Sequence, residues 1–325
     1  MRQVRVGSIQ PLEQERIYTA EPLGADLIRT TREANLDLAC RLLSQAGEAG
    51  CDIVAYPEDI QGIGHYLIHP DPGLFTGCVE RLPGPTSERI AGVARKHRMH
   101  VVYSQYELVG ETIYNAAVLL GRDGEIIGTY YKVQLPSIER WVVAHGDSFP
   151  VFQTDFGTVG MMVCYDINFP EITRCLVLRG AELVFCPTMG VKERWEHEEI
   201  GLIRPRMRAI DNFVPVVVSS CRAESVIVGS NGEVLAQARP RTEEVISAVI
   251  DLDGTPVDHS DWELSSGLSD VKGRFFQERL PEVYRPLTDP RPAVLERYRD
   301  RPLRPAPKDH REFVEDLRRW RSDAR

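Results

Sequence analysis

The sequence lacks an apolar run long enough to cross a membrane. A membrane-spanning helix needs roughly 20 consecutive apolar residues, whereas the longest apolar runs, such as Val214–Val218 and Gly160–Cys164, are far shorter. The first ten residues, MRQVRVGSIQ, contain arginines but not the apolar segment of a secretory signal peptide. We therefore expect no membrane partner and a cytoplasmic location.

The sequence also has no CxxC pair and no excess of basic residues. The odd number and scattered positions of its cysteines argue against a disulfide framework and against a structural zinc site. The seven cysteines are Cys40, Cys51, Cys78, Cys164, Cys175, Cys186 and Cys221. The formal net charge is -9, and no basic run is interleaved with aromatic residues. The sequence therefore predicts no nucleic-acid partner.

Short apolar runs alternate with helix-like stretches through the first third of the chain. The 325 residues are 42% hydrophobic and 27% charged, a composition that can bury a core. Strands are predicted at Val4–Ile9, Asp52–Tyr56 and His100–Tyr106, and helices at about Thr31–Glu48 and Ser87–Arg98. This alternation is typical of an α/β layered fold.

From Thr112 onward the predicted strands follow one another closely. Predicted strands at Tyr114–Leu120 and Ile126–Lys132 flank a turn that contains Asp123 and Gly124. A second pair of strands, at Val151–Thr154 and Val159–Cys164, flanks a turn that ends at Gly157. Hairpins added to helix-linked strands indicate mixed β-sheets.

Two segments of the chain share one pattern. Gly50–Glu58 and Gly180–Thr188 each follow a predicted helix, continue as an apolar strand and end with proline and a polar residue. This similarity implies two related βαβ halves with an internal pseudo-two-fold relation, although the same pattern also recurs by chance in α/β proteins. Two such halves favour a four-layer αββα sandwich with two mixed β-sheets face to face.

The end of the chain differs in charge from the rest. Residues 285–325 hold 12 Lys or Arg and 8 Asp or Glu, a charge of +4, so the remaining residues carry -13. We assign residues 1–281 to the main domain and residues 282–325 to a C-terminal extension, with a short amphipathic helix from about His310 to Trp320. The extension is either a solvated tail or an arm for oligomerisation, and the sequence leaves both open.

Cys164 is the first candidate for chemistry. It follows an apolar strand and precedes a helix predicted at Pro170–Leu178, since proline suits the first turn of a helix. A side chain on such a strand-to-helix elbow lies at the carboxyl end of a strand, where α/β folds carry their sites, and the helix N-terminus would favour a thiolate. A buried, inert thiol is the alternative.

A cysteine nucleophile needs a base and a donor for the oxyanion. None of the eight histidines follows a predicted strand in this way; His65 and His69, for example, lie in a loop rich in glycine and proline. Glu58 and Lys132 do lie at the ends of apolar strands. Each alone is typical of a surface residue, but three polar groups at three strand ends indicate a site.

With these residues in place, the sequence resembles the nitrilase superfamily of carbon-nitrogen hydrolases from its first strand to about Asp253. Three motifs follow the family's order of Glu, Lys and Cys: Tyr56-Pro57-Glu58, Tyr131-Lys132-Val133-Gln134-Leu135-Pro136 and Val163-Cys164-Tyr165-Asp166. The resemblance implies the αββα sandwich, self-association into a homodimer or higher homo-oligomer, and neither a metal nor an organic cofactor. It also implies a second glutamate after the lysine, for which Glu139 is the best match.

The resemblance further implies an amidase-like enzyme that hydrolyses a small-molecule amide or N-carbamoyl compound through a thioester on Cys164. Glu58 would accept the proton of Cys164 and donate it to the leaving nitrogen. Lys132 and the backbone N-H of Tyr165 would bind the oxyanion, and Glu139 would hold Lys132 in place. The family's nitrile-cleaving members more often have Cys-Trp-Glu where this chain has Cys164, Tyr165 and Asp166. A nitrile substrate is therefore the alternative.

Three positions depart from the family pattern, and we expect all of them to border the pocket. Asp59 follows Glu58 where the family frequently has a bulky apolar residue. Gly190 stands where the family often has a tryptophan after the Pro-Thr pair, and the loop Arg222–Ser225 is shorter than the family's usual loop.

Two other function classes also remain. A metal-dependent phosphoesterase could use the Glu and His residues of Trp195–Glu199, although a charged helix face explains that segment more simply. A non-enzymatic protein of the same fold would be expected to lack one of the three strand-end residues.

Overall fold

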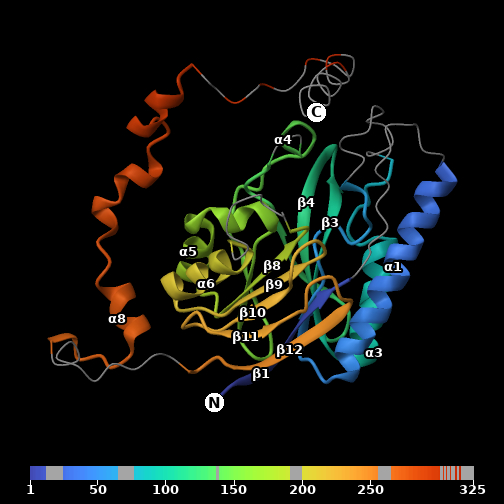
Figure 1. Ribbon diagram of the computed structural model, residues 1–325, viewed down its shortest axis with the longest axis horizontal. Coiled ribbons are helices and arrows are strands. Elements are labelled where there is room, and N and C mark those ends of the chain that lie inside the picture. The colour runs from blue at the N-terminus through green and yellow to red at the C-terminus, as the bar shows by residue number, and fades with distance from the viewer. Residues whose placement is uncertain are drawn as a thin grey trace.

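The computed structural model describes residues 1–11, 25–64, 77–136, 139–190, 200–254 and 265–300, together with residues 303, 305, 308, 312 and 315. These described residues form two six-stranded mixed β-sheets packed face to face, with helices on both outer faces (Figure 1). This is the four-layer αββα sandwich predicted from the sequence.

The first sheet combines parallel and antiparallel strands. Its strands are β1 (Gln3–Gln10), β2 (Ile53–Ala55), β3 (His100–Val109), β4 (Thr112–Leu120), β5 (Ile126–Tyr131) and β12 (Glu244–Asp251). They lie in the order β12-β1-β2-β3-β4-β5. The central strands β1, β2 and β3 are parallel, whereas β12, β4 and β5 run antiparallel to their neighbours.

The second sheet repeats this arrangement. Its strands are β6 (Val151–Gln153), β7 (Thr158–Met161), β8 (Leu183–Thr188), β9 (Val216–Ser220), β10 (Val226–Val228) and β11 (Val234–Gln237). Their order is β11-β10-β9-β8-β7-β6, with β7, β8 and β9 parallel and the outer strands antiparallel. β2 and β8, which come from the two similar sequence segments, occupy equivalent central positions. The two related halves are therefore present in the topology.

Helices cover the outer face of each sheet. α1 (Ala25–Glu48) and α3 (Pro85–His97) lie against the first sheet, and α5 (Pro170–Leu178) and α6 (Ile200–Asn212) lie against the second (Figure 1). α3 and α5 both begin with proline, whose fixed φ suits the first helical turn. The observed bounds of α5 are those predicted from the sequence.

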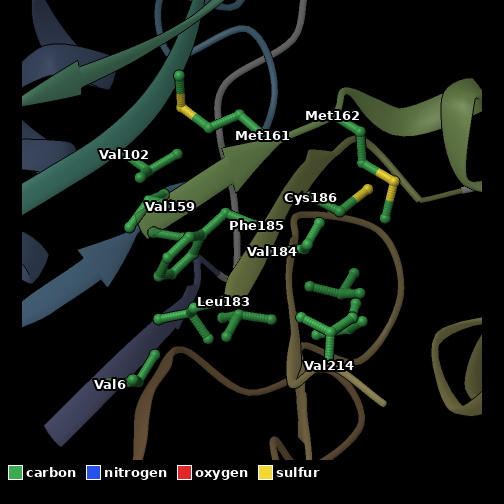
Figure 2. Close-up of a cluster of buried hydrophobic side chains, with 14 of the residues drawn as sticks. Val6, Val102, Val159, Met161, Met162, Leu183, Val184, Phe185, Cys186 and Val214 are labelled. Carbon is green, nitrogen blue, oxygen red and sulfur yellow. The ribbon is translucent and has the colours of Figure 1, made fainter. Parts of the chain in front are cut away.

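The hydrophobic core follows the alternation of side chains along the strands. Phe185 of β8 lies on the same side as Val6 and Val102 of the first sheet, whereas Val184 and Cys186 lie on the opposite side (Figure 2). The parallel strands β7 to β9 are buried on both faces and thus read as nearly continuous apolar runs. This packing fixes the strand ends that carry the polar residues.

The strand before Cys164 is shorter than predicted. β7 ends at Met161, and Cys164 begins a 3-10 helix, Cys164–Asn168, that leads into α5. The backbone of Cys164 has a φ of 48°, in the left-handed region that residues other than glycine rarely adopt. The predicted strand-to-helix elbow is therefore a separate 3-10 turn between β7 and α5.

The chain leaves the sandwich after β12. α8 (Val271–Gln277) contacts the end of α6, where the rings of Phe275 and Phe213 lie 5.3 Å apart. Further 3-10 helices at Pro281–Val283, Arg285–Thr288 and Ala293–Tyr298 stand apart from the sheets (Figure 1). The helix predicted at about His310–Trp320 lies outside the described residues, apart from residues 312 and 315. No helix among the described residues is long and apolar enough to cross a membrane.

Candidate active site

The predicted site residues come together at one edge of the sandwich. Glu58 follows β2 and Lys132 follows β5, which point the same way because β4 lies antiparallel between β3 and β5. Cys164 follows β7 of the facing sheet, and Glu139 begins the short helix α4 (Glu139–Val142). Carboxyl ends of strands from both sheets thus meet around one point.

Lys132 lies at the centre of this cluster. Its side chain is only 1% exposed, and its Nζ donates hydrogen bonds to Glu58 Oε1 at 2.8 Å and to Glu139 Oε2 at 2.7 Å. Burial alone would lower the pKa of Lys132, but the charges of Glu139 and Glu58 outweigh it and raise the pKa well above its ordinary value. Lys132 is therefore an ammonium held between two buried carboxylates.

Asn115 ties the two carboxylates together. Its Nδ2 donates to Glu58 Oε1 at 2.8 Å and to Glu139 Oε1 at 2.7 Å. The backbone N-H of Met189 donates to Glu58 Oε2 at 3.1 Å, and the hydroxyl of Tyr106 donates to Glu139 Oε1 at 3.4 Å. Both oxygens of Glu58 therefore have fixed directions.

The two glutamates differ in proton affinity. Burial would raise the pKa of Glu58, but the charge and hydrogen bond of Lys132 lower it below the ordinary value. Burial raises the pKa of Glu139, and Lys132 offsets this only in part. Glu58 is therefore the more acidic of the two glutamates, and its ionised carboxylate can accept a proton.

The Glu58 carboxylate and the Thr188 side chain both lie close enough to the Cys164 thiol to shift its pKa: Glu58 raises it and Thr188 lowers it. Loss of solvation around the Cys164 thiol and the charge of Glu58 raise the pKa of this thiol far above its ordinary value. The charge of Lys132 lowers the pKa only in part. The expectation that the helix N-terminus would favour a thiolate is therefore wrong for the resting site. The structure favours a neutral thiol that faces an ionised base.

Residues 7–256, which include all strands of both sheets except the start of β1, match the model of the carbon-nitrogen hydrolase family. The chain belongs to this family. It is 30% identical over 222 residues to a probable nitrilase of Schizosaccharomyces pombe, covering 64% of this chain and 76% of that protein. It is 31% identical over 252 residues to an omega-amidase of Xenopus tropicalis, covering 70% and 86%. A solved double mutant of an amidase from Nesterenkonia sp. AN1, in complex with acrylamide, aligns with a TM-score of 0.65 at 21% identity, covering 88% and 97%.

Membership of the carbon-nitrogen hydrolases confirms the superfamily resemblance stated from the sequence and replaces the phosphoesterase alternative. The geometry agrees, because the Lys132 ammonium occupies the place between Glu58 and Glu139 that a metal ion would need. Among the residues that the structure describes, no group of three His, Cys, Asp or Glu could hold a metal ion. The segment Trp195–Glu199 lies outside the described residues.

Sequence reasoning missed Asn115 and gave Thr188 no role. Asn115 is a buried polar residue of β4 that directly precedes the apolar run Ala116–Leu120. An isolated amide at such a position needs hydrogen-bond partners, so its place beside an apolar run was the available signal. Thr188 ends β8, as Glu58 follows the equivalent strand β2, and the internal repeat could have identified it.

In this hydrolase, Asp59 anchors the chain that follows Glu58. Its backbone has a φ of 59°. Its carboxylate accepts hydrogen bonds from the N-H groups of Ile63 at 3.0 Å and Gly64 at 2.7 Å. A bulky apolar side chain could not make these bonds, so the departure from the family pattern has a local structural reason.

The other two departures form one feature. Gly190 has a φ of 73°, and a Cβ there would lie 2.4 Å from Ser220 Oγ and 2.9 Å from the backbone nitrogen of Ala223. The short loop Arg222–Ser225 therefore passes where a side chain at position 190 would stand. Gly190 follows Met189, whose N-H contacts Glu58, so this contact lies beside the cluster.

Proposed function

We propose that the chain hydrolyses the carbon-nitrogen bond of a small-molecule amide or N-carbamoyl compound through a thioester on Cys164. The observation that carries this proposal is the buried ion pair of Glu58 and Lys132, with the Cys164 thiol close enough to Glu58 for the two groups to shift each other's pKa. A nucleophile, a base and a cation thus share one small space, as acyl transfer requires.

In the first half of the reaction, Glu58 takes the thiol proton while Cys164 Sγ attacks the carbonyl carbon. The carbonyl oxygen becomes an oxyanion, which Lys132 Nζ and the backbone N-H of Tyr165 bind. One such donor is typically worth about 3 kcal/mol of transition-state stabilisation. Glu58 then gives the proton to the leaving nitrogen, and ammonia or an amine departs.

In the second half, water opens the thioester. Glu58 takes a proton from the attacking water, and the collapse of the second tetrahedral intermediate returns that proton to the Cys164 sulfur. The product is a carboxylic acid, or a carbamic acid from a carbamoyl group. Glu139 holds Lys132 through both halves, and the side chains and water supply every proton, so the proposal needs no cofactor.

Alanine at Cys164 tests the nucleophile. We expect Cys164→Ala to lose turnover of an amide panel while keeping its folded circular dichroism spectrum. Cys175→Ala is the matched control, since Cys175 is a half-buried free thiol on α5, outside the cluster. Substantial activity in Cys164→Ala would refute the mechanism.

An amide is preferred over a nitrile in this proposal. An amide gives an oxyanion that Lys132 and the Tyr165 N-H bind, and it releases its nitrogen after one protonation by Glu58. A nitrile forms a thioimidate and needs a further proton and water. Matched pairs with the same acyl chain decide between them: we expect a higher kcat/KM for the primary amide, and a consistently higher value for the nitrile would reverse the assignment.

We further propose that residues 282–325 are an arm that binds a second copy of the hydrolase domain, residues 1–281. Ile203, Met207 and Ile210 form one exposed apolar stripe along α6, whose end contacts α8, the last α-helix before the arm. The arm itself exposes apolar residues, among them Leu287 and Val294. A second copy of the chain would cover both surfaces.

Truncation after Tyr284 tests the arm, with truncation after Leu303 as the control that keeps the three described 3-10 helices. We expect the chain that ends at Tyr284 to form a smaller assembly in light scattering or to melt at a lower temperature, and the chain that ends at Leu303 to do neither. Unchanged mass and stability would make the arm a solvated tail. We also propose a cytoplasmic location, because the nucleophile must stay reduced and none of the seven cysteines, each among the described residues, forms a disulfide bond.

A further inference from the structure

A buried carboxylate that the proposed mechanism does not use lies two residues after the nucleophile. Asp166 is fully buried within the 3-10 helix that Cys164 begins. Its Oδ2 accepts from the Tyr130 hydroxyl at 2.8 Å and from the Val163 N-H at 3.0 Å, and its Oδ1 accepts from the Gln134 N-H at 2.8 Å. Three donors from two segments therefore converge on one side chain.

These three donors frame the two reactive residues. Val163 immediately precedes Cys164, so one bond holds the elbow of the second sheet. Tyr130 and Gln134 lie two residues before and two residues after Lys132, so the other bonds hold both sides of the lysine on the first sheet. One carboxylate thus connects the backbone of the nucleophile with the backbone of the ammonium.

The elbow needs such support, because Cys164 has a left-handed backbone conformation that is strained for a residue other than glycine and persists only where its surroundings hold it. The Asp166 N-H also donates to the Val163 carbonyl at 3.1 Å, which closes the turn from the other side. Burial raises the pKa of Asp166 to about 6, so its carboxylate is ionised at pH 8 and can accept from all three donors.

We propose that Asp166 is a positioning residue that sets the distance between Cys164 and Lys132, and with it the alignment of the oxyanion site formed by Lys132 and the Tyr165 N-H. Asp166 does not touch the substrate and acts through the backbone on either side of it. This inference rests on the proposed function, since it assigns the geometry of that same site.

The test separates oxyanion alignment from thiol reactivity. Asp166→Asn puts an N-H₂ group where one oxygen accepted hydrogen bonds, so at least one donor faces another donor. We expect kcat/KM for an amide at pH 8 to fall roughly 10- to 100-fold, as for a misplacement of about 1 Å. The rate at which iodoacetamide alkylates Cys164, which needs no oxyanion site, should change less than about threefold.

Tyr130→Phe provides a second, milder variant, because it removes one donor and leaves the carboxylate and both backbone donors in place. We expect a loss of about fivefold in kcat/KM with unchanged alkylation. Since Tyr130 acts through Asp166, the double variant should be no more than about twofold worse than Asp166→Asn alone. If Asp166→Asn does not fold, the kcat/KM and the alkylation rate of Tyr130→Phe provide the test.

The matched control is Asp155→Asn, which alters a carboxylate that joins the two sheets at the opposite edge. Asp155 accepts from Arg122 and lies 2.7 Å from His100 Nε2, and its variant should keep kcat/KM within about twofold. The inference is overturned if Asp166→Asn keeps wild-type kcat/KM, if turnover and alkylation fall together, or if the two single losses multiply. Retained activity in Cys164→Ala would instead refute the proposed function itself.

Discussion

Replacing Lys132 by methionine removes the one ammonium that the structure places between Glu58 and Glu139. Methionine keeps much of the length and apolar volume of the lysine stem, so the change isolates the charge. Both carboxylates are nearly fully buried and hydrogen bond to Nζ at 2.8 and 2.7 Å. Removing one partner from a buried ion pair typically costs about 3–5 kcal/mol of stability, because a charge is left without compensation.

The cost should depend on pH, because a carboxylate can escape by taking up a proton. Without Lys132, one carboxyl in the folded variant would have its pKa raised above the unfolded value of about 4.3. The folded variant then binds one more proton than the unfolded chain, so its free energy of unfolding falls as pH rises. Holding that proton costs about 5 kcal/mol at pH 8 and about 1 kcal/mol at pH 5, at about 1.4 kcal/mol per pH unit.

Urea unfolding of the wild type and of Lys132→Met at pH 5 and pH 8 measures this difference. We expect a loss of about 3–5 kcal/mol at pH 8 and of about 1–2 kcal/mol at pH 5. Lys96→Met, which changes an exposed lysine on α3, is the control and should cost little at either pH. An equal loss at both pH values would refute the reasoning, since it would mean that the two carboxyls were not ionised beside the lysine.

Two further predictions concern the residues around Glu58. Asn115→Leu removes both hydrogen bonds from Nδ2 to the carboxylates, at about 1.5–3 kcal/mol for each bond to a charged group. We expect a stability loss of about 3–6 kcal/mol in urea and a roughly 100-fold lower kcat/KM; a variant with wild-type kinetics would show that the bridge is dispensable. Alkylation of Cys164, followed by mass spectrometry, should keep rising above pH 9 because its thiol pKa is raised. A plateau below pH 7 would instead indicate a preformed thiolate.

The strand ends of this fold were predictable because buried parallel strands appear in the sequence as short apolar runs. Ile53–Ala55 and Leu183–Thr188 are such runs, and the residues that follow or end them stand at the edge of a sheet. The motifs at Glu58, Lys132 and Cys164 therefore predicted a common edge. The structure adds the distances that make this edge a site.

Contacts across strands were not predictable in the same way. Asn115 reaches Glu58 and Glu139 because β4 pairs with β3 in a register that sets Asn115 opposite Tyr106. A register shift of one residue would turn this amide to the other face of the sheet. The protonation state of Cys164 was missed for a related reason, since the pKa of a thiol depends on how closely the folded chain surrounds it.

A thiol with a raised pKa is compatible with catalysis in this site, because the attack changes where the charge lies and not how much charge is buried. Before attack, two ionised carboxylates and one ammonium give the cluster a net charge of -1. In the proposed mechanism the proton passes from Cys164 to Glu58, so one negative charge leaves the carboxylate and appears on the substrate oxygen beside Lys132. The total stays at -1, so no charge has to enter a poorly solvated interior during the step. A preformed thiolate beside ionised Glu58 and Glu139 would instead bring the resting cluster to -2, which explains why the buried site holds the proton on sulfur until the substrate arrives.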